Sequence, residues 1–234
     1  MLCRLTISKY PKGFGIFGIL SMVLFRIPLS FNKNISFYKL MGCGRNGTFD
    51  THPDWNQWAM LTVFNKATTN TEETALLKEV KLPLFIRHYL KLFRCNSTEY
   101  ILLPIEGHGT WDKKNCFGTL PATSNYDGNI AILTRATIRT NKLIRFWSHV
   151  HNIAEEMKQA EGFICSVGIG ELPFIKNGTF SIWENKTAVK NFAYTMKNHK
   201  EVVVKTRKEN WYKEEMFVRF RPLFIKSSQV PKKA

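Results

Sequence analysis

The feature that most constrains the fold is an internal repeat in the order of the predicted elements. Alternating apolar residues predict strands, and apolar residues three or four positions apart predict helices. Both halves of the chain follow the order strand, helix, strand, strand, helix, strand. In the first half we expect these elements at Cys3–Ser8, Phe14–Phe25, Ser36–Gly44, Asn56–Phe64, Thr71–Leu92 and Glu99–Gly107. In the second half we expect them at Asn129–Arg139, Lys142–Ala160, Ile164–Glu171, Thr179–Trp183, Thr187–Lys205 and Phe217–Ile225.

A β-α-β-β-α-β unit is the ferredoxin-like motif. The repeat therefore predicts an α+β protein in which tandem ferredoxin-like repeats form an α+β barrel. The similarity of Phe37–Gly44 to Phe163–Gly170 supports the duplication. Gly, Pro, Ser and Asn collect between residues 112 and 128, as they do in linkers. We predict a first repeat over 1–111, a linker over 112–128, a second repeat over 129–226 and a basic tail over 227–234.

The segment Phe14–Phe25 allows three interpretations. It is almost unbroken apolar sequence after Arg4, Lys9 and Lys12, which resembles a signal-peptide core and is too short to span a bilayer. No convincing cleavage site follows it, and the repeat favours a buried helix instead. Contact between this helix and a membrane is the third interpretation.

The second half holds a hairpin and a helix with one histidine. Two β-rich runs flank Asn177-Gly178, a dipeptide typical of tight turns, so we predict a turn there. In the helix that follows, Phe192 and His199 lie on one apolar stripe. Such a histidine is either a core residue with one hydrogen bond or a metal ligand above an apolar cofactor.

The net charge of +16 is the strongest signal in the composition, and it would attract nucleic acid, anionic lipid or an acidic partner. Lys and Arg are dispersed and form no zinc-finger or RNP-type motif, so we expect no nucleic-acid partner. A membrane surface fits better if the substrate is a lipid, although a basic chain need not have any such partner. The five cysteines are scattered, which favours a reducing compartment over a disulfide scaffold or zinc site. We expect a cytoplasmic protein, with peripheral contact to the inner face of the membrane as a further option.

Common catalytic signatures are missing from the sequence. It contains no G-x-S-x-G elbow, P-loop or H-E-x-x-H motif, which disfavours hydrolases and P-loop nucleotide-dependent enzymes. Among the six histidines, His108 lies in a Gly-His-Gly sequence where the backbone can approach a ligand closely. We therefore take His108 as a second candidate site residue.

Several motifs in the second half make the chain resemble the spheroidene monooxygenase family, which oxidises acyclic carotenoids. They are Gly168-Ile-Gly-Glu171-x-Pro173, Thr179-Phe-Ser-Ile-Trp183, Phe192-Ala-Tyr194, His199 and Trp211-Tyr-x-Glu-Glu-x-Phe-x-Arg-Phe220. The resemblance extends over most of the chain and is looser in the first half. It agrees with the predicted fold, because the family resembles the dimeric α+β barrel class.

The resemblance also implies a haem cofactor. Carried over to this sequence, it makes His199 the iron ligand on the helix that carries Phe192, with the opposite face of the haem open to oxygen. Trp183 would line the haem or polyene pocket, and Arg135 and Arg139 are candidates to meet the haem propionates. Each of the last three residues also has an ordinary structural interpretation, Trp183 as core packing and the two arginines as charges at a strand edge.

The expected function is therefore that of a haem-dependent, iron-containing monooxygenase of carotenoid biosynthesis. It would use molecular oxygen and an electron donor such as a ferredoxin to convert a lipophilic polyene to a hydroxy or keto product. Two alternatives stay open: another haem reaction on the same fold, such as aldoxime dehydration or haem breakdown, and a non-catalytic barrel that binds haem or an apolar ligand.

Overall fold

The computed structural model describes residues 1–45, 52–65, 73–195, 205–206 and 208–228. Within these residues the chain divides into two compact units, one of residues 1–43, 54–103 and 222–228, and the other of residues 44–45, 52–53 and 104–221. The predicted helix position His199 lies outside the described residues.

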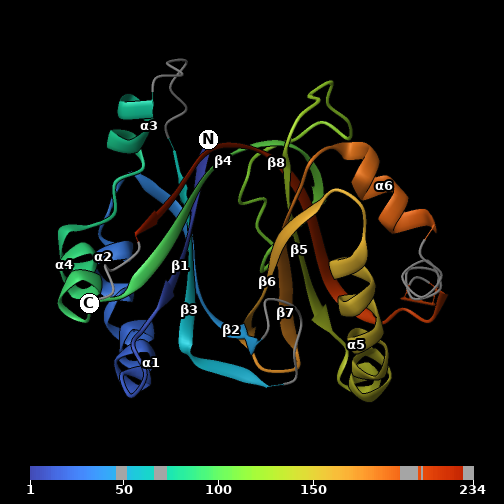
Figure 1. The fold of residues 1–234 in the computed structure, drawn as a ribbon, viewed down its shortest axis with the longest axis horizontal. Coiled ribbons are helices and arrows are strands. Elements are labelled where there is room, and N and C mark those ends of the chain that lie inside the picture. Colours follow the sequence, from blue (N-terminus) through green and yellow to red (C-terminus); the bar gives the residue numbers. More distant parts are fainter. Residues whose placement is uncertain (46–51, 66–72, 196–204, 207, 229–234) are drawn as a thin grey trace. The chain divides into compact units, whose positions relative to one another are not determined.

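The first unit carries one β-α-β-β-α-β set, with its helical segments each divided in two (Figure 1). The elements are β1 (Leu2–Lys9), α1 (Gly15–Leu24), α2 (Arg26–Ser30), β2 (Ile35–Gly44), β3 (Pro53–Phe64), α3 (Glu73–Glu79), α4 (Leu84–Leu92) and β4 (Asn96–Gly109). Strand β1 lies between β3 and β4 and is antiparallel to both. The expected helical stretch 71–92 is interrupted between Glu79 and Leu84, and Pro83 directly precedes α4, as expected for a residue that lacks the N–H a helix interior needs.

The second unit repeats the set with single helices. Its elements are β5 (Ile130–Ile138), α5 (Leu143–Gln159), β6 (Phe163–Leu172), β7 (Lys176–Trp183), α6 (Lys186–Thr195) and β8 (Tyr212–Ser228), with a short 3₁₀ turn at Thr140–Lys142. Strand β5 lies between β7 and β8, and β7 pairs with β6, each pair antiparallel. The residues of β4 and β8 are shared between the two units.

Hydrogen bonding links the strands in the order β1-β3-β2-β6-β7-β5-β8-β4 and closes a barrel. Within each unit the order is that of the ferredoxin-like motif, with the first strand between the third and the fourth. The prediction of tandem ferredoxin-like repeats forming an α+β barrel is therefore confirmed.

Two local predictions need correction. The turn expected at Asn177-Gly178 is wrong, because both residues lie inside β7 and pair with β5 and β6. Gly178 is there for close packing, since a Cβ on it would lie 2.6 Å from the carbonyl oxygen of Thr134. The chain instead turns just before β7, where Phe174 has a left-handed φ of 65°.

The second correction concerns the first helix. Phe14–Phe25 is helical from Gly15 to Leu24, as expected, but it is not buried on all sides. Its buried residues are Gly18 and Ser21, whereas several large apolar residues are exposed. No helix in the described part of the chain is long and apolar enough to cross a membrane.

Candidate functional site

The predicted cofactor residues Trp183 and Phe192 lie together on the helix-covered face of the second unit (Figure 1). Trp183 ends β7 and Phe192 lies on α6, and their ring centroids are 5.2 Å apart. Both side chains are buried in a cluster with residues of β5 and α5. The face between β7 and α6 is therefore apolar and aromatic.

Arg135, which we expected near the same cofactor, lies on the opposite face of the sheet. Side chains alternate between the two faces of a strand, and Ile130 and Ile132 of β5 belong to the cluster around Trp183. Arg135, three residues after Ile132, therefore points to the other face. Arg139 is exposed and lies just beyond the end of β5.

His108 lies on β4 and its imidazole is exposed to solvent. Its ring stacks on that of Phe217, with the centroids 5.8 Å apart. Because Phe217 packs against the cluster around Trp183, His108 lies at the exposed edge of that cluster and not on the Arg135 side of the sheet.

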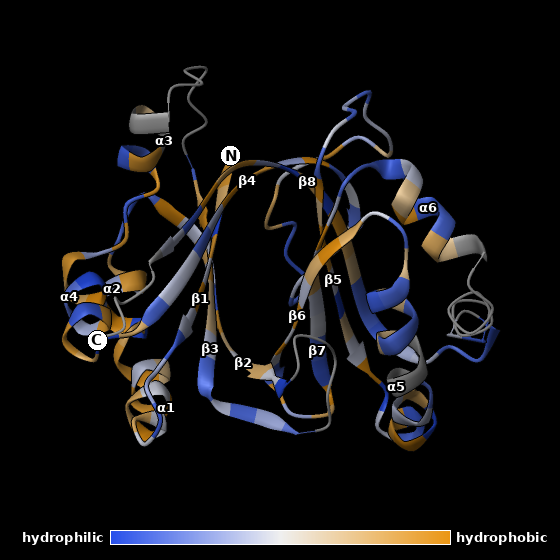
Figure 2. Cartoon of the chain, viewed as in Figure 1, coloured by the Kyte–Doolittle hydropathy of each residue, from blue (hydrophilic) through white to orange (hydrophobic). Residues whose placement is uncertain are grey.

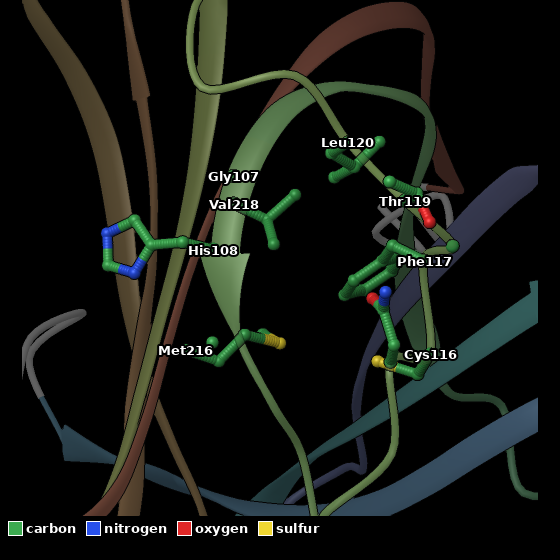
Figure 3. A pocket seen from close by; sticks show the side chains of 11 residues that line it. Gly107, His108, Cys116, Phe117, Thr119, Leu120, Met216 and Val218 are labelled. Atoms are coloured by element: carbon green, nitrogen blue, oxygen red, sulfur yellow. The ribbon is translucent and has the colours of Figure 1, made fainter.

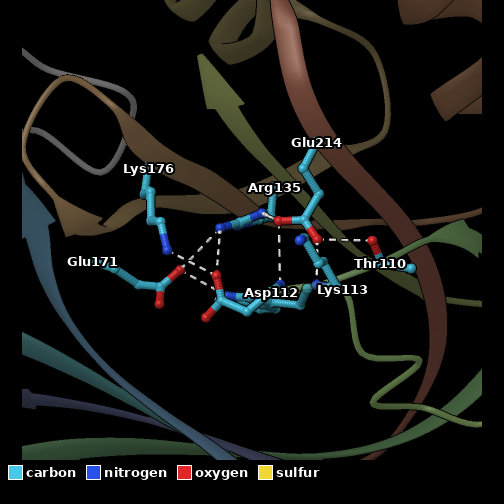
Figure 4. A network of polar contacts seen from close by, with 8 residues as sticks. Thr110, Asp112, Lys113, Arg135, Glu171, Lys176 and Glu214 are labelled. Carbon is cyan, nitrogen blue, oxygen red and sulfur yellow. Dashed lines mark hydrogen bonds and ion pairs between the residues drawn. The ribbon is translucent and has the colours of Figure 1, made fainter. Parts of the chain in front are cut away.

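Arg135 is the centre of a buried network of charges (Figure 4). Only 3% of this residue is exposed. One guanidinium nitrogen donates to Glu214 on β8, and the other lies 3.4 Å from Oδ1 of Asp112 and 3.5 Å from Oε1 of Glu171 on β6. Lys176 Nζ donates to the same Asp112 oxygen at 2.8 Å. Three carboxylates from three separate segments thus share two cations.

The Glu214 carboxylate is held by several donors. The Thr110 hydroxyl donates to it at 2.8 Å, and the backbone N–H groups of Asp112 and Lys113 donate at 3.2 and 2.6 Å. Burial alone would raise the pKa of Glu214, but these hydrogen bonds and the Arg135 guanidinium outweigh it and lower the pKa below its usual range. Glu214 therefore stays ionised at neutral pH.

The two backbone donors explain an unusual backbone conformation. Asp112 and Lys113 both have left-handed φ values, of 51° and 62°. This conformation is unfavourable for residues other than glycine, by about 1–2 kcal/mol each. It lets successive N–H groups point at one anion, so the hydrogen bonds to Glu214 offset the strain.

Trp111 completes the arrangement from the same segment. Its indole N–H donates to Glu171 Oε1 at 2.7 Å, and the Arg135 guanidinium carbon lies 5.6 Å from its ring centroid. The side chain is almost fully buried. The network thus fixes residues 110–113 against β5, β6 and β8.

A cavity of about 140 Å³ lies next to this fixed segment (Figure 3). It is lined by Gly107, His108, Gly109, Met216, Val218 and residues 115–120. Figure 3 shows the imidazole of His108 turned away from Phe117 and Leu120, on the other side of its strand. This volume is enough for several waters or a short piece of an apolar chain.

A second charge cluster lies around Glu106 of β4, whose residue is 2% exposed. Lys186, at the start of α6, and Arg219 of β8 both donate to its carboxylate, and the N–H of Ser124 donates at 2.7 Å. Burial would raise the pKa of Glu106, but these donors lower it to about 2. Two cations face one carboxylate here, so the cluster carries a positive formal charge.

Trp183 and Phe192 were predicted from the sequence as site residues, and they lie together in the structure. No role was predicted for Glu171, Glu214 or Glu106. Glu171 and Glu214 do occur in the motifs that carry the family resemblance. Their presence in these motifs was the available signal. Within the described residues, no group of three or more His, Cys, Asp and Glu is arranged to hold a metal ion.

Comparison with solved structures identifies the class of fold. The chain superposes on aldoxime dehydratase with a TM-score of 0.60, covering 97% of this chain and 81% of that one. Their sequences are 9% identical, so this likeness concerns the fold alone. The protein is thus a duplicated ferredoxin-like α+β barrel of the kind seen in that enzyme.

Sequence comparison identifies the family. No protein-family model matches the chain. Spheroidene monooxygenase of Rhodobacter capsulatus is 33% identical over 220 residues, which cover 92% of this chain and 86% of that relative. Spheroidene monooxygenase of Cereibacter sphaeroides is 30% identical over 217 residues, covering 92% of this chain and 64% of that relative. The chain belongs to the spheroidene monooxygenase family and is an oxidoreductase of the monooxygenase type.

Proposed function

We propose that this enzyme uses haem to oxidise an acyclic carotenoid, or a similar lipophilic polyene, to a hydroxy or keto product. The observation that carries the proposal is the 33% identity over 92% of the chain to a protein named spheroidene monooxygenase. Because the match also covers 86% of that relative, the reaction type and the substrate class are inferred together. Molecular oxygen and an electron donor such as a ferredoxin would complete the reaction.

The helix-covered face of the second unit is the place we propose for the haem. Trp183 and Phe192 would form apolar walls there, since a flat macrocycle is held largely by apolar and aromatic surfaces. His199, which follows α6 in the sequence, would hold the haem iron. When bound, haem would supply the oxidising chemistry, and the protein would supply the ligand, the apolar slot and the surrounding charges.

The charges available on this face also fit a haem. Arg219 lies two residues after Phe217, which packs against the cluster around Trp183, and so shares its face of β8. Its Nε is buried and has no hydrogen-bond partner within the described residues. With Lys186 it gives the Glu106 cluster its surplus positive charge, which suits the anionic propionates of haem. Arg135 is a weaker candidate for this role, because three carboxylates already surround it on the opposite face.

The first test is a visible spectrum of the purified protein after expression with added haem. We expect a Soret band that weakens or shifts in His199→Ala. His149→Ala is a matched control, because His149 is half-buried on α5 and its Nδ1 lies 2.8 Å from the carbonyl oxygen of Arg145 in its own helix. A band that is unchanged in His199→Ala would refute the assignment of the ligand, and His108→Ala would then be measured.

The second test follows the oxygen atom. The haem-loaded protein would be given a reductant, an acyclic carotenoid in detergent and isotopically labelled molecular oxygen. We expect a hydroxy or keto carotenoid that carries the label, with oxygen consumed in proportion to product. A Soret band without any product would instead support a non-catalytic haem-binding barrel, and the absence of both would overturn the proposal.

A further inference from the structure

An exposed apolar stripe runs along the first helical segment. Ile16, Ile19, Leu20, Val23 and Ile27 follow the spacing i, i+3, i+4, i+7 and i+11, which places them on one side of a helix. Their exposed fractions lie between 40% and 64%. A surface helix of a globular protein normally turns such a stripe toward the core, so this orientation needs an explanation.

The opposite side of α1 shows that the orientation is built into the packing. Gly18 and Ser21 are the buried residues of α1. A Cβ on Gly18 would lie 2.1 Å from the indole nitrogen of Trp58, so a larger residue does not fit. The Ser21 hydroxyl donates to the Gly18 carbonyl oxygen at 2.6 Å. Small residues thus let α1 approach the sheet closely while its large apolar residues face outward.

The neighbouring helix α4 extends the exposed apolar surface. Its Leu84, Phe85 and Leu92 are 48% to 74% exposed. The two helices are in contact, because the rings of Phe17 and Phe93 stack with centroids 4.2 Å apart. We call the exposed residues of α1, α2 and α4 the apolar patch: Phe14, Ile16, Ile19, Leu20, Val23, Ile27, Phe31, Leu84, Phe85 and Leu92. Figure 2 shows hydrophobic residues along these three helices.

The two segments that carry the apolar patch hold charges of one sign. Residues 1–49 contain no Asp or Glu, and neither do residues 80–98. Exposed cations are interspersed with the patch on the same segments: Lys9, Lys12, Arg26, Lys33, Lys81, Arg87, Lys91 and Arg94. The partner that complements this surface must therefore be both apolar and anionic.

We propose that the apolar patch docks on an anionic lipid bilayer, with α1 lying in the interface between headgroups and acyl chains. An interfacial helix has one apolar face in the lipid and Lys or Arg at its edges, and each cation near an anionic leaflet adds to the attraction. A second copy of this chain fits less well, since a two-fold contact would bring like charges together. A nucleic acid would use the cations but not the apolar residues. The inference rests on the first unit alone and stands apart from the proposed reaction.

The test is sedimentation of the full-length protein with vesicles of phosphatidylcholine, either alone or with about one third phosphatidylglycerol. We expect binding to the anionic vesicles, weaker binding to the neutral ones, and loss of the difference at high salt. The variant Ile16→Ser/Val23→Ser/Ile27→Ser removes exposed side chains and should lower partitioning into anionic vesicles about a hundredfold. Ile144→Ser is the matched control, because Ile144 is 91% exposed on α5 of the other unit; it should bind as the unchanged protein does.

Four results would overturn the inference. They are no binding of vesicles by the unchanged protein, equal binding by the triple variant, a loss of binding in Ile144→Ser as large as in the triple variant, and equal binding of neutral and anionic vesicles. Analytical ultracentrifugation without lipid separates the rival occupant: a dimer that the triple variant dissociates, in a protein that binds no vesicles, would assign the patch to self-association. Oxidation of a detergent-dispersed carotenoid should be equal in all these variants, so failure of docking and failure of the proposed reaction are distinguishable.

Discussion

Replacing Arg135 with methionine removes a buried cation and leaves its neighbouring carboxylates in place. The charge-assisted hydrogen bond to Glu214 is worth about 2 kcal/mol. The contacts to Asp112 and Glu171, at 3.4 and 3.5 Å, are longer and add about 0.5 kcal/mol each at most. Glu214 would keep its three other donors, which limits the penalty of leaving it unpaired. We therefore expect a loss of about 3 kcal/mol in the free energy of unfolding, at the lower end for a broken buried pair.

The loss should depend on pH in a defined direction. Because the pKa of Glu214 is lowered in the folded state, its contribution is present above the pKa of the unfolded chain, about 4.3, and is lost as the pH falls through the folded pKa. Without Arg135 the folded pKa would rise, so less stability remains to be lost. The difference between the two proteins should be largest near neutral pH and should shrink below about pH 4.

Urea unfolding of both proteins near pH 7 and below about pH 4 measures the loss of unfolding free energy and its dependence on pH. Arg139→Met is the matched control, since Arg139 is exposed and its substitution should change stability by less than about 0.5 kcal/mol. A loss of under about 1 kcal/mol for Arg135→Met, or a loss that is equal near neutral pH and below about pH 4, would refute the account of Arg135 as a partner that keeps Glu214 ionised.

Two further substitutions test other parts of the second unit. Glu106→Gln should lower the free energy of unfolding by about 2–3 kcal/mol near neutral pH, because a folded pKa of about 2 lies roughly two units below the unfolded value. In urea titrations that difference should disappear between about pH 5 and pH 2, and a pH-independent difference would contradict the pKa. Gly178→Ala should cost about 2 kcal/mol or more, because its Cβ would lie 2.6 Å from a carbonyl oxygen of β5. Gly42→Ala, whose nearest neighbour would be 3.8 Å away, should lie within about 1 kcal/mol of the unchanged protein in thermal or urea unfolding.

The elements of the fold could be predicted because their signals are local. Apolar alternation predicted a strand at Asn129–Arg139, and β5 runs from Ile130 to Ile138. The turn at Asn177-Gly178 was wrongly predicted because the local preference of this dipeptide gave way to a tertiary requirement. Gly178 is needed where β7 passes close to β5. The residues around Gly178 in the sequence could not predict this contact, because its partner Thr134 lies in a distant segment.

The candidate site was harder to predict for the same reason. Asp112, Glu171 and Glu214 are 23, 36 and 79 residues from Arg135 in the sequence. Their convergence depends on strand order and register rather than on spacing. The sequence also could not predict which side of α1 is exposed. An apolar stripe predicts that a helix has an apolar side but not that this side meets the sheet.

The anchoring of residues 110–113 has a consequence for how this family is recognised. Glu171 and Glu214 belong to the sequence signature, and the structure uses both to hold one arginine and one loop. The presence of these residues therefore indicates that a protein has this fold, not that it is active. A descendant of this gene could lose its activity under relaxed selection and would still carry these residues for as long as it had to fold. Genome searches that rely on the signature would then group active enzymes with inactive paralogues, and sorting them would require residues that contact the substrate.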